Sequence, residues 1–120
     1  MTVKECYTKL GGDYEGVVGR FRGEERVQRF ALKFLSDSSY EELCQALEAQ
    51  NVADAFRAAH TLKGVAQNLG FTPLYQSSHE MTEALRDGHP GDVSALLQQI
   101  RADYEQTVAA LNGLKAEQQG

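Results

Sequence analysis

Residues 51–70 read NVADAFRAAHTLKGVAQNLG and carry the most regular helical pattern of the chain. Apolar side chains recur there at alternating three- and four-residue spacings, at Val52, Ala55, Ala59, Leu62, Ala66 and Leu69. Such a spacing places them on one stripe of an α-helix, and the stripe must be buried against other elements. Asn51 favours the start of this helix, and Gly70 favours its end. The segment therefore predicts one long helix with a single buried face.

The segments on either side show the same helical spacing. No window alternates apolar and polar residues as a half-buried strand would. Four long amphipathic segments joined by short turns favour antiparallel neighbours around a shared seam. We therefore expect an all-α fold, an antiparallel four-helix bundle over about residues 24–115. The expected inward-facing residues are Val27, Phe30, Ala31, Phe34, Tyr40, Leu43, Cys44, Leu47, Leu74, Ser78, Met81, Leu85, Val93, Leu96, Leu97, Ile100, Tyr104, Val108 and Leu111.

Capping residues and turn formers set the expected helix boundaries. Two pairs have the spacing of a capping box, Thr2 with Glu5 and Ser38 with Glu41. Thr72-Pro73 is typical of an N-cap followed by proline at the first helical position. We expect short lead-in helices over about residues 2–22, divided at Gly11-Gly12, and a final helix from about Gly91 to Lys115.

Length and charge limit the classes of function. The chain has 120 residues and a formal net charge of −5, and we expect residues 1–120 to form a single domain and a monomer. An acidic protein repels polyanions, so we expect protein partners and neither nucleic acid nor membrane. No apolar run reaches the roughly 20 residues that cross a bilayer, and residues 1–6 lack a signal-peptide pattern. These features predict a cytoplasmic protein.

The two cysteines, Cys6 and Cys44, are too few and too irregularly spaced for a disulfide framework or a zinc site. We expect both to be reduced thiols. Cys44 falls on an apolar stripe and is expected to be a small core residue, and Cys6 an ordinary first-turn residue.

His60, Lys63, Gly64 and Gln67 share a second face of the helix that follows Asn51, since they are spaced i, i+3, i+4 and i+7. Imidazole is the side chain whose ordinary pKa, about 6.5, leaves a nucleophilic nitrogen free in much of the population at neutral pH. Lys63 places an ammonium group where it can neutralise phosphoryl oxygens. Gly64 leaves a gap beside the imidazole for the close approach of a partner. This face predicts a phosphoryl acceptor at His60.

Residues 58–70 resemble the His-x-x-Lys-Gly motif region of the histidine phosphotransfer (HPt) family of phosphorelays, and the helices over residues 24–50 and 73–115 resemble those on either side of that motif. The resemblance implies that His60 is phosphorylated, that Lys63 is the cation beside the phosphate, and that a receiver domain approaches at Gly64. It also implies that Gln67 and Asn68 orient the imidazole or contact the phosphoryl group. The family often has smaller residues than Val65 and Gln67 at these two places.

The same resemblance implies the partners. Response-regulator receiver domains and a sensor or hybrid histidine kinase would exchange the phosphoryl group with His60. We expect the chain to need no cofactor or metal of its own, the Mg²⁺ being held by the receiver. It carries no ATP-binding kinase motif, so it is expected to be a phosphotransfer intermediate and not a self-sufficient enzyme.

Two other functions stay open. The chain could be the phosphoacceptor domain of a chemotaxis-type histidine kinase, although no kinase or dimerisation segment is found in these 120 residues. It could also be an adaptor bundle that keeps the motif without using it. His79 and His89 lack a cation and a glycine on the same face, and we expect them to be structural or solvated.

Overall fold

The computed structural model describes residues 1–119, with the side chains of residues 1–117. Within that part of the chain every regular element is a helix, and no residue is in a strand, so the predicted all-α class is confirmed. In chain order the elements are α1 (Val3–Leu10), α2 (Tyr14–Phe21), α3 (Glu24–Lys33), the 3-10 turn η1 (Phe34–Ser36), α4 (Ser39–Glu48), α5 (Val52–Asn68), α6 (Thr72–Leu85) and α7 (Ser94–Gln119).

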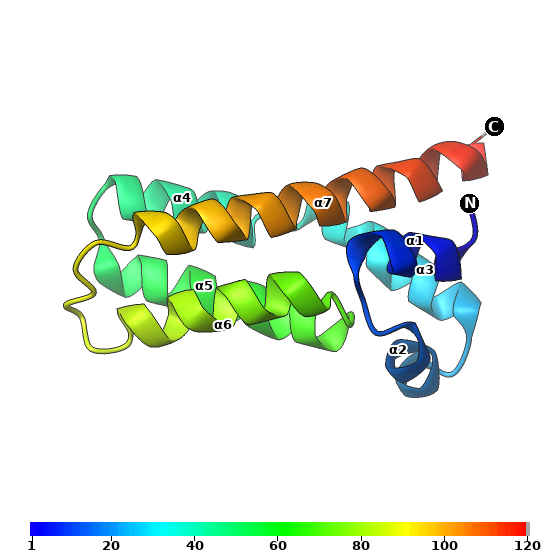
Figure 1. Ribbon diagram of the computed structural model, residues 1–120, viewed down its shortest axis with the longest axis horizontal. Helices are drawn as coiled ribbons and strands as arrows, with labels where there is room; N and C mark the ends of the chain where they lie inside the picture. Colours follow the sequence, from blue (N-terminus) through cyan, green and yellow to red (C-terminus); the bar gives the residue numbers. More distant parts are fainter. Residues whose placement is uncertain (120) are drawn as a thin grey trace.

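The helices form an elongated molecule of 44 × 27 × 19 Å. Figure 1 shows α4, α5, α6 and α7 along its length, with α1, α2 and α3 gathered at one end. From α4 onward each helix packs on the next one along the chain, α4 on α5, α5 on α6, and α6 on α7. α1 packs against α7. None of the helices in residues 1–119 is both long and apolar enough to span a membrane.

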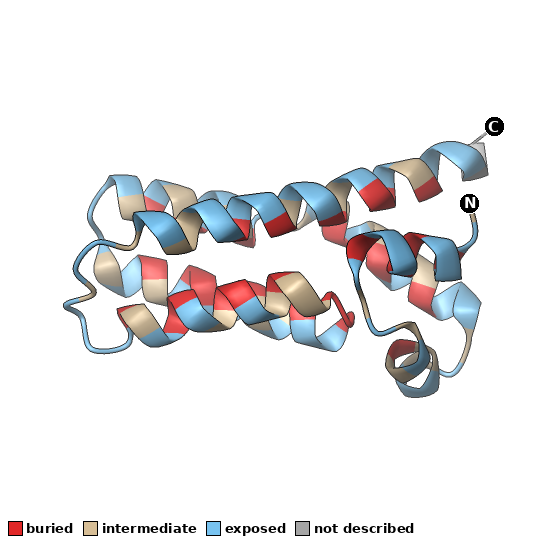
Figure 2. Ribbon diagram, in the orientation of Figure 1, coloured by how far each residue is buried: buried red, intermediate tan, exposed pale blue. Residues whose placement is uncertain are grey.

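The buried face of α5 is the predicted one. Its stripe is buried at Ala55, Ala59, Leu62, Ala66 and Leu69, whereas Val52 is half-buried and Ala58 joins the buried set. In Figure 2 buried residues recur along both α5 and α6. The prediction also holds for α6, where Leu74, Ser78, Met81 and Leu85 are buried.

The expected inward positions of α7 divide into two groups. Ile100 and Leu111 are fully buried. The others are half-buried and pack on the edge of the core, namely Val93, Leu96, Leu97, Tyr104 and Val108. α7 begins at Ser94, three residues later than expected, and continues past Lys115 to Gln119.

Phe30 is the clearest error among the predicted core residues, since its side chain is 37% exposed. In α3 the buried positions are Val27 and Ala31, and Phe34 is buried in η1. These three residues are spaced four and three apart, so they lie on one face of the helix and already occupy the positions that face the core. Phe30 lies at the margin of that face, where its ring stacks on Phe21 at 5.2 Å between centroids.

α1 is more than a lead-in element. It buries Val3, Cys6, Tyr7 and Leu10 completely or nearly so, which corrects the expectation of an ordinary first-turn Cys6. The Tyr7 hydroxyl donates a buried hydrogen bond of 2.7 Å to the carbonyl of Leu69, at the end of α5. Cys44, expected in the core, is half-buried, and both cysteines are free.

Two of the predicted caps are confirmed. The Thr2 hydroxyl accepts from the backbone N–H of Glu5, and the Glu5 carboxylate accepts from the backbone N–H of Thr2, each at 3.1 Å. Asn51 Oδ1 accepts from the N–H of Asp54 at 3.0 Å and caps α5. Gly11 ends α1 at φ 75°, a left-handed conformation that glycine adopts without strain.

The other two caps are wrong. Ser38 makes no side-chain cap, and its hydroxyl donates instead to the Glu42 carboxylate at 3.2 Å. The Asp37 carboxylate accepts from the N–H of Ser39 at 2.8 Å. α6 includes Thr72 as its first residue, with Phe71 at the N-cap and no side-chain hydrogen bond there.

Candidate functional site

His60 lies near the middle of α5 with its side chain exposed, on a face turned away from Ala59 and Leu62, which are fully buried. The helix that carries it is fixed at both ends. Asn51 caps the first turn, and at the last turn the guanidinium of Arg20 from α2 donates to the carbonyls of Gln67, at 3.2 Å, and Asn68. Satisfying these terminal carbonyls stabilises the end of the helix. His60 is therefore presented to solvent by a well-anchored helix.

An aromatic ring lies beside the imidazole, and a cation lies over that ring. The ring of Phe56, one turn earlier, stands edge-on to the ring of His60 with 6.1 Å between centroids. The guanidinium of Arg86, at the end of α6, lies over the ring of Phe56 at 5.4 Å. Glu83 holds Arg86 there by two hydrogen bonds of 3.0 and 2.9 Å. Sequence reasoning missed Phe56 and Arg86, because only the packing of α5 against α6 brings Arg86 over Phe56.

Lys63 is half-buried on α5, one turn after His60. The pKa of the Glu83 carboxyl is lowered, mainly by its hydrogen bonds from Arg86, and the charges of Arg86, His79 and Lys63 add smaller effects. The charge of Lys63 therefore acts on Glu83 of α6, and Lys63 itself lies one turn from His60. An ammonium so placed can stabilise negative charge that develops nearby.

Gly64 is exposed, and a Cβ atom added to it would meet no atom within 4 Å. Packing inside the chain therefore does not require glycine at this position. An exposed glycine inside a helix is about 1 kcal/mol less favourable than alanine. The open space beside His60 allows another molecule to approach the backbone of α5 closely.

An open groove of about 460 Å³ lies beside His60 and is lined also by Phe30, Gly64, Asn68 and Leu69. Among the residues predicted for the site, His60, Gly64 and Asn68 thus share one groove. Gln67 lies with Arg20 in a neighbouring hollow of about 270 Å³, which Gly64 and Asn68 also line. Sequence reasoning missed Phe30 and Arg20 as neighbours of the site, because they come from α3 and α2.

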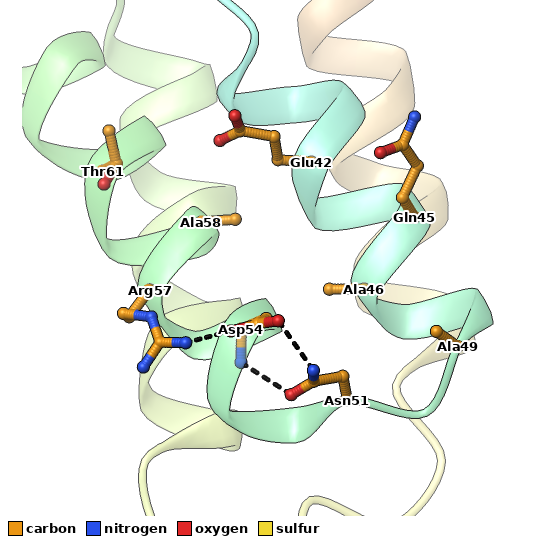
Figure 3. A pocket seen from close by; sticks show the side chains of 9 residues that line it. All are labelled: Glu42, Gln45, Ala46, Ala49, Asn51, Asp54, Arg57, Ala58 and Thr61. Atoms are coloured by element: carbon orange, nitrogen blue, oxygen red, sulfur yellow. Dashed lines mark hydrogen bonds and ion pairs between the residues drawn. The ribbon is translucent and has the colours of Figure 1, made fainter.

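A second groove, of about 420 Å³, runs between α4 and α5 and is drawn in Figure 3. Its polar groups at one end are already paired with one another. Asn51 donates to Asp54 at 2.7 Å and caps its backbone N–H, and Arg57 contacts the same carboxylate. Because Asp54 and Arg57 neutralise one another, this end of the groove offers a ligand little free charge, and we assign the site to the groove beside His60.

The other two histidines lie elsewhere. His79 is half-buried on α6, its ring stacks on Tyr75 at 6.0 Å, and its Nδ1 is buried without a hydrogen-bond partner among the described residues. His89 is exposed between α6 and α7. Within residues 1–119, no three side chains of the His, Cys, Asp and Glu types come together as a metal site would require.

Comparison with known proteins gives one match. A family model described as "Hpt domain" matches residues 35–110, which include α4, α5, α6 and the larger part of α7. No curated protein and no solved structure matches the chain.

Proposed function

Because this chain belongs to the Hpt domain family, whose members carry phosphoryl groups on histidine, we propose that it is a phosphocarrier of a multistep phosphorelay. In this proposal, His60 accepts a phosphoryl group from the aspartate of one receiver domain and passes it to the aspartate of another. The observation that carries the proposal is the exposed imidazole of His60 beside the open space at Gly64. A nucleophile so placed is accessible to a second protein's active site.

The transfer needs little covalent machinery from the chain. An imidazole nitrogen of His60 attacks the phosphorus of the aspartyl phosphate, an N–P bond forms, and the P–O bond breaks to release the receiver's carboxylate. The second transfer is the reverse, with a new aspartate as nucleophile. Catalysis of this kind depends on positioning and on the neutralisation of charge. The contact of His60 with Phe56 supports the positioning role, because it restricts the orientation of the ring.

The neighbours of His60 are proposed to divide the remaining work. Lys63 would neutralise phosphoryl oxygens, and Gly64 would let the receiver come close. Asn68, which lines the groove with His60, is the better placed of the two polar residues to contact a phosphoryl group or a partner. Gln67 lies in the adjoining hollow and would act on the partner side.

The partners in this proposal are receiver domains and a sensor or hybrid kinase. Mg²⁺ would be held by the receiver, since that partner carries the carboxylates that such a cation prefers. The chain itself would be a phosphotransfer intermediate and would not use ATP.

We take α4 to α7 as the antiparallel four-helix bundle that presents His60. Short turns between α4, α5 and α6 and the packing of each consecutive pair support this arrangement. A single cluster of buried residues drawn from α1 through α7 supports treating residues 1–120 as one domain.

The test is transfer from a panel of receiver domains that have been phosphorylated on aspartate with acetyl phosphate. The proposal predicts acid-labile, base-stable phosphate on this chain after incubation with a cognate receiver. Phosphoramidate, a small donor that needs no docking surface, should label the same residue. Absence of label from both donors would favour a non-catalytic adaptor.

A further inference from the structure

Phe30 is the one large apolar side chain that is exposed among the residues whose side chains the structure describes. Its position is fixed by its neighbours, since the ring stacks on Phe21 at an interplanar angle of 23° and the ammonium of Lys33 lies 5.1 Å from its centroid. A rigid aromatic residue held at the surface is typical of the side chains that anchor protein interfaces.

The exposed ring of Phe30 belongs to the same groove as His60. Phe30 forms one wall of it from α3, and His60 and Gly64 lie on α5, with Val65 and Leu69 adding apolar surface between them. A partner that reaches His60 across the open space at Gly64 would therefore also cover Phe30. The apolar part of the groove is continuous with the proposed phosphotransfer site.

Charge distinguishes this end of the molecule. Residues 20–33 hold five of the twelve lysine and arginine residues and only two of the seventeen aspartate and glutamate residues. The five cations are Arg20, Arg22, Arg26, Arg29 and Lys33. This segment is thus basic in a protein whose net charge is −5. Two of its cations stand next to the groove, because Lys33 lies over Phe30 and Arg20 lines the hollow beside Gly64.

We propose that Arg20, Phe21, Phe30 and Lys33, here called the α2–α3 edge, form a docking and specificity surface for the receiver domain that exchanges phosphate with His60. The inference rests on the proposed function and adds to it a surface outside residues 35–110, the part that the family model matches. Phe30 is the apolar anchor of this surface, and Lys33 and Arg20 are its cations.

Charge complementarity favours a receiver domain as the partner that binds the basic α2–α3 edge. A receiver binds its divalent cation partly through carboxylates, so we expect acidic side chains around its active site. Such side chains are attracted to the α2–α3 edge and repelled by the acidic remainder of the chain, which orients the encounter. Residues that differ at this edge would select among receivers that share the same active-site chemistry.

The test compares Phe30→Ala with Phe30→Leu and with Leu32→Ala. Leu32 is half-buried on the same helix and does not line the groove beside His60; it lines a separate hollow with Glu25, Gln28 and Lys33. With a receiver phosphorylated by acetyl phosphate, Phe30→Ala should lower kcat/KM for transfer about tenfold or more, as truncation of an interface anchor does. The loss should lie in KM. Phe30→Leu should recover most of it, and Leu32→Ala should stay within about twofold of the wild type.

Labelling by phosphoramidate separates this inference from the proposed function. Leu32→Ala should react with phosphoramidate as the wild type does. The two Phe30 variants should lose far less labelling by phosphoramidate than by the receiver, since that donor needs no docking surface. A wild type that phosphoramidate cannot label would refute the proposed function itself. Unchanged receiver kinetics in Phe30→Ala would overturn the docking surface, as would an equal loss in Leu32→Ala. A concentration-dependent dimer that Phe30→Ala abolishes, with receiver transfer intact, would assign the surface to a second copy and also overturn it.

Discussion

His60, Lys63 and Gly64 lie within about one turn of α5, yet their surroundings differ. The imidazole of His60 is exposed beside the ring of Phe56, whereas Lys63 is half-buried and its charge acts on Glu83. Gly64 faces open space. These surroundings give each residue a separate consequence when it is replaced.

Replacement of Lys63 should change the chemistry and spare the docking. Lys63→Ala removes a positive charge and adds no bulk, so we expect transfer from a phosphorylated receiver to slow by about tenfold. The effect should be smaller than that of removing a hydrogen-bond donor from an active site that excludes water, because Lys63 is partly exposed to solvent. Quenched time courses of phosphoryl transfer measure the rate, and a binding titration against the unphosphorylated receiver measures the docking affinity. Lys63→Arg keeps the charge and should recover part of the rate. A Lys63→Ala variant that transfers at the wild-type rate would remove Lys63 from the site.

Replacement of Gly64 should have opposite effects on stability and on transfer. Gly64→Ala fills open space on an exposed helix surface, so the free energy of unfolding should rise by up to about 1 kcal/mol. Gly64→Leu should weaken receiver binding by steric clash while phosphoramidate still labels the chain. Urea unfolding and receiver titration measure the two outcomes. Unchanged receiver affinity in Gly64→Leu would show that no partner approaches there.

At the scale of helices, sequence patterns predicted the core faces of α5 and α6 because both helices are long and each buries one regular stripe. They failed at Phe30, since a short helix at the end of the molecule has room in the core for only Val27 and Ala31. They failed at Ser38 as well, because the Ser38 hydroxyl donates to the Glu42 carboxylate and accepts from no backbone N–H of the first turn. Phe56 and Arg86 could not be paired from the sequence, since their contact depends on the register between α5 and α6.

The buried stripe of α5 can be tested by one pair of variants. Leu62 is fully buried, so Leu62→Ala should lower the free energy of unfolding by about 2–5 kcal/mol through lost burial and a residual cavity. Thr61→Ala, at the exposed neighbouring position, should change it by no more than about 0.5 kcal/mol. Chemical denaturation of both variants gives the comparison. Equal effects at the two positions would contradict the orientation assigned to the helix.

At the scale of the whole molecule, α1 connects α7, the last helix of the chain, with the end of α5. It packs against α7, its Tyr7 hydroxyl bonds to the end of α5, and the backbone N–H of Asp13 donates to the carbonyl of Gly70 at 2.9 Å. The sequence held a signal for this role, because Val3, Cys6, Tyr7 and Leu10 have the spacing of a buried stripe. We expected only a lead-in helix because α1 is short.

Burial of α1 predicts a loss of stability at alkaline pH. Burial raises the pKa of the Cys6 thiol from its ordinary value of 9.0 to about 11. The unfolded chain therefore loses this proton at lower pH than the folded chain, so the contribution of Cys6 to stability is complete below pH 9 and declines as pH rises toward about 11. Urea midpoints across this range should fall, and Cys6→Ala should reduce that pH dependence more than Cys44→Ala does. Identical pH profiles for the two variants would contradict the burial of Cys6.

The measurement that tests the proposed phosphocarrier function most directly is the labelling of histidine variants by a phosphorylated receiver and by phosphoramidate. His60→Gln should abolish acid-labile label while changing the free energy of unfolding by no more than about 0.5 kcal/mol, because the side chain is exposed. His79→Gln and His89→Gln should label as the wild type does. Acid-labile phosphate that persists on a folded His60→Gln variant would place the acceptor elsewhere and contradict the proposed mechanism.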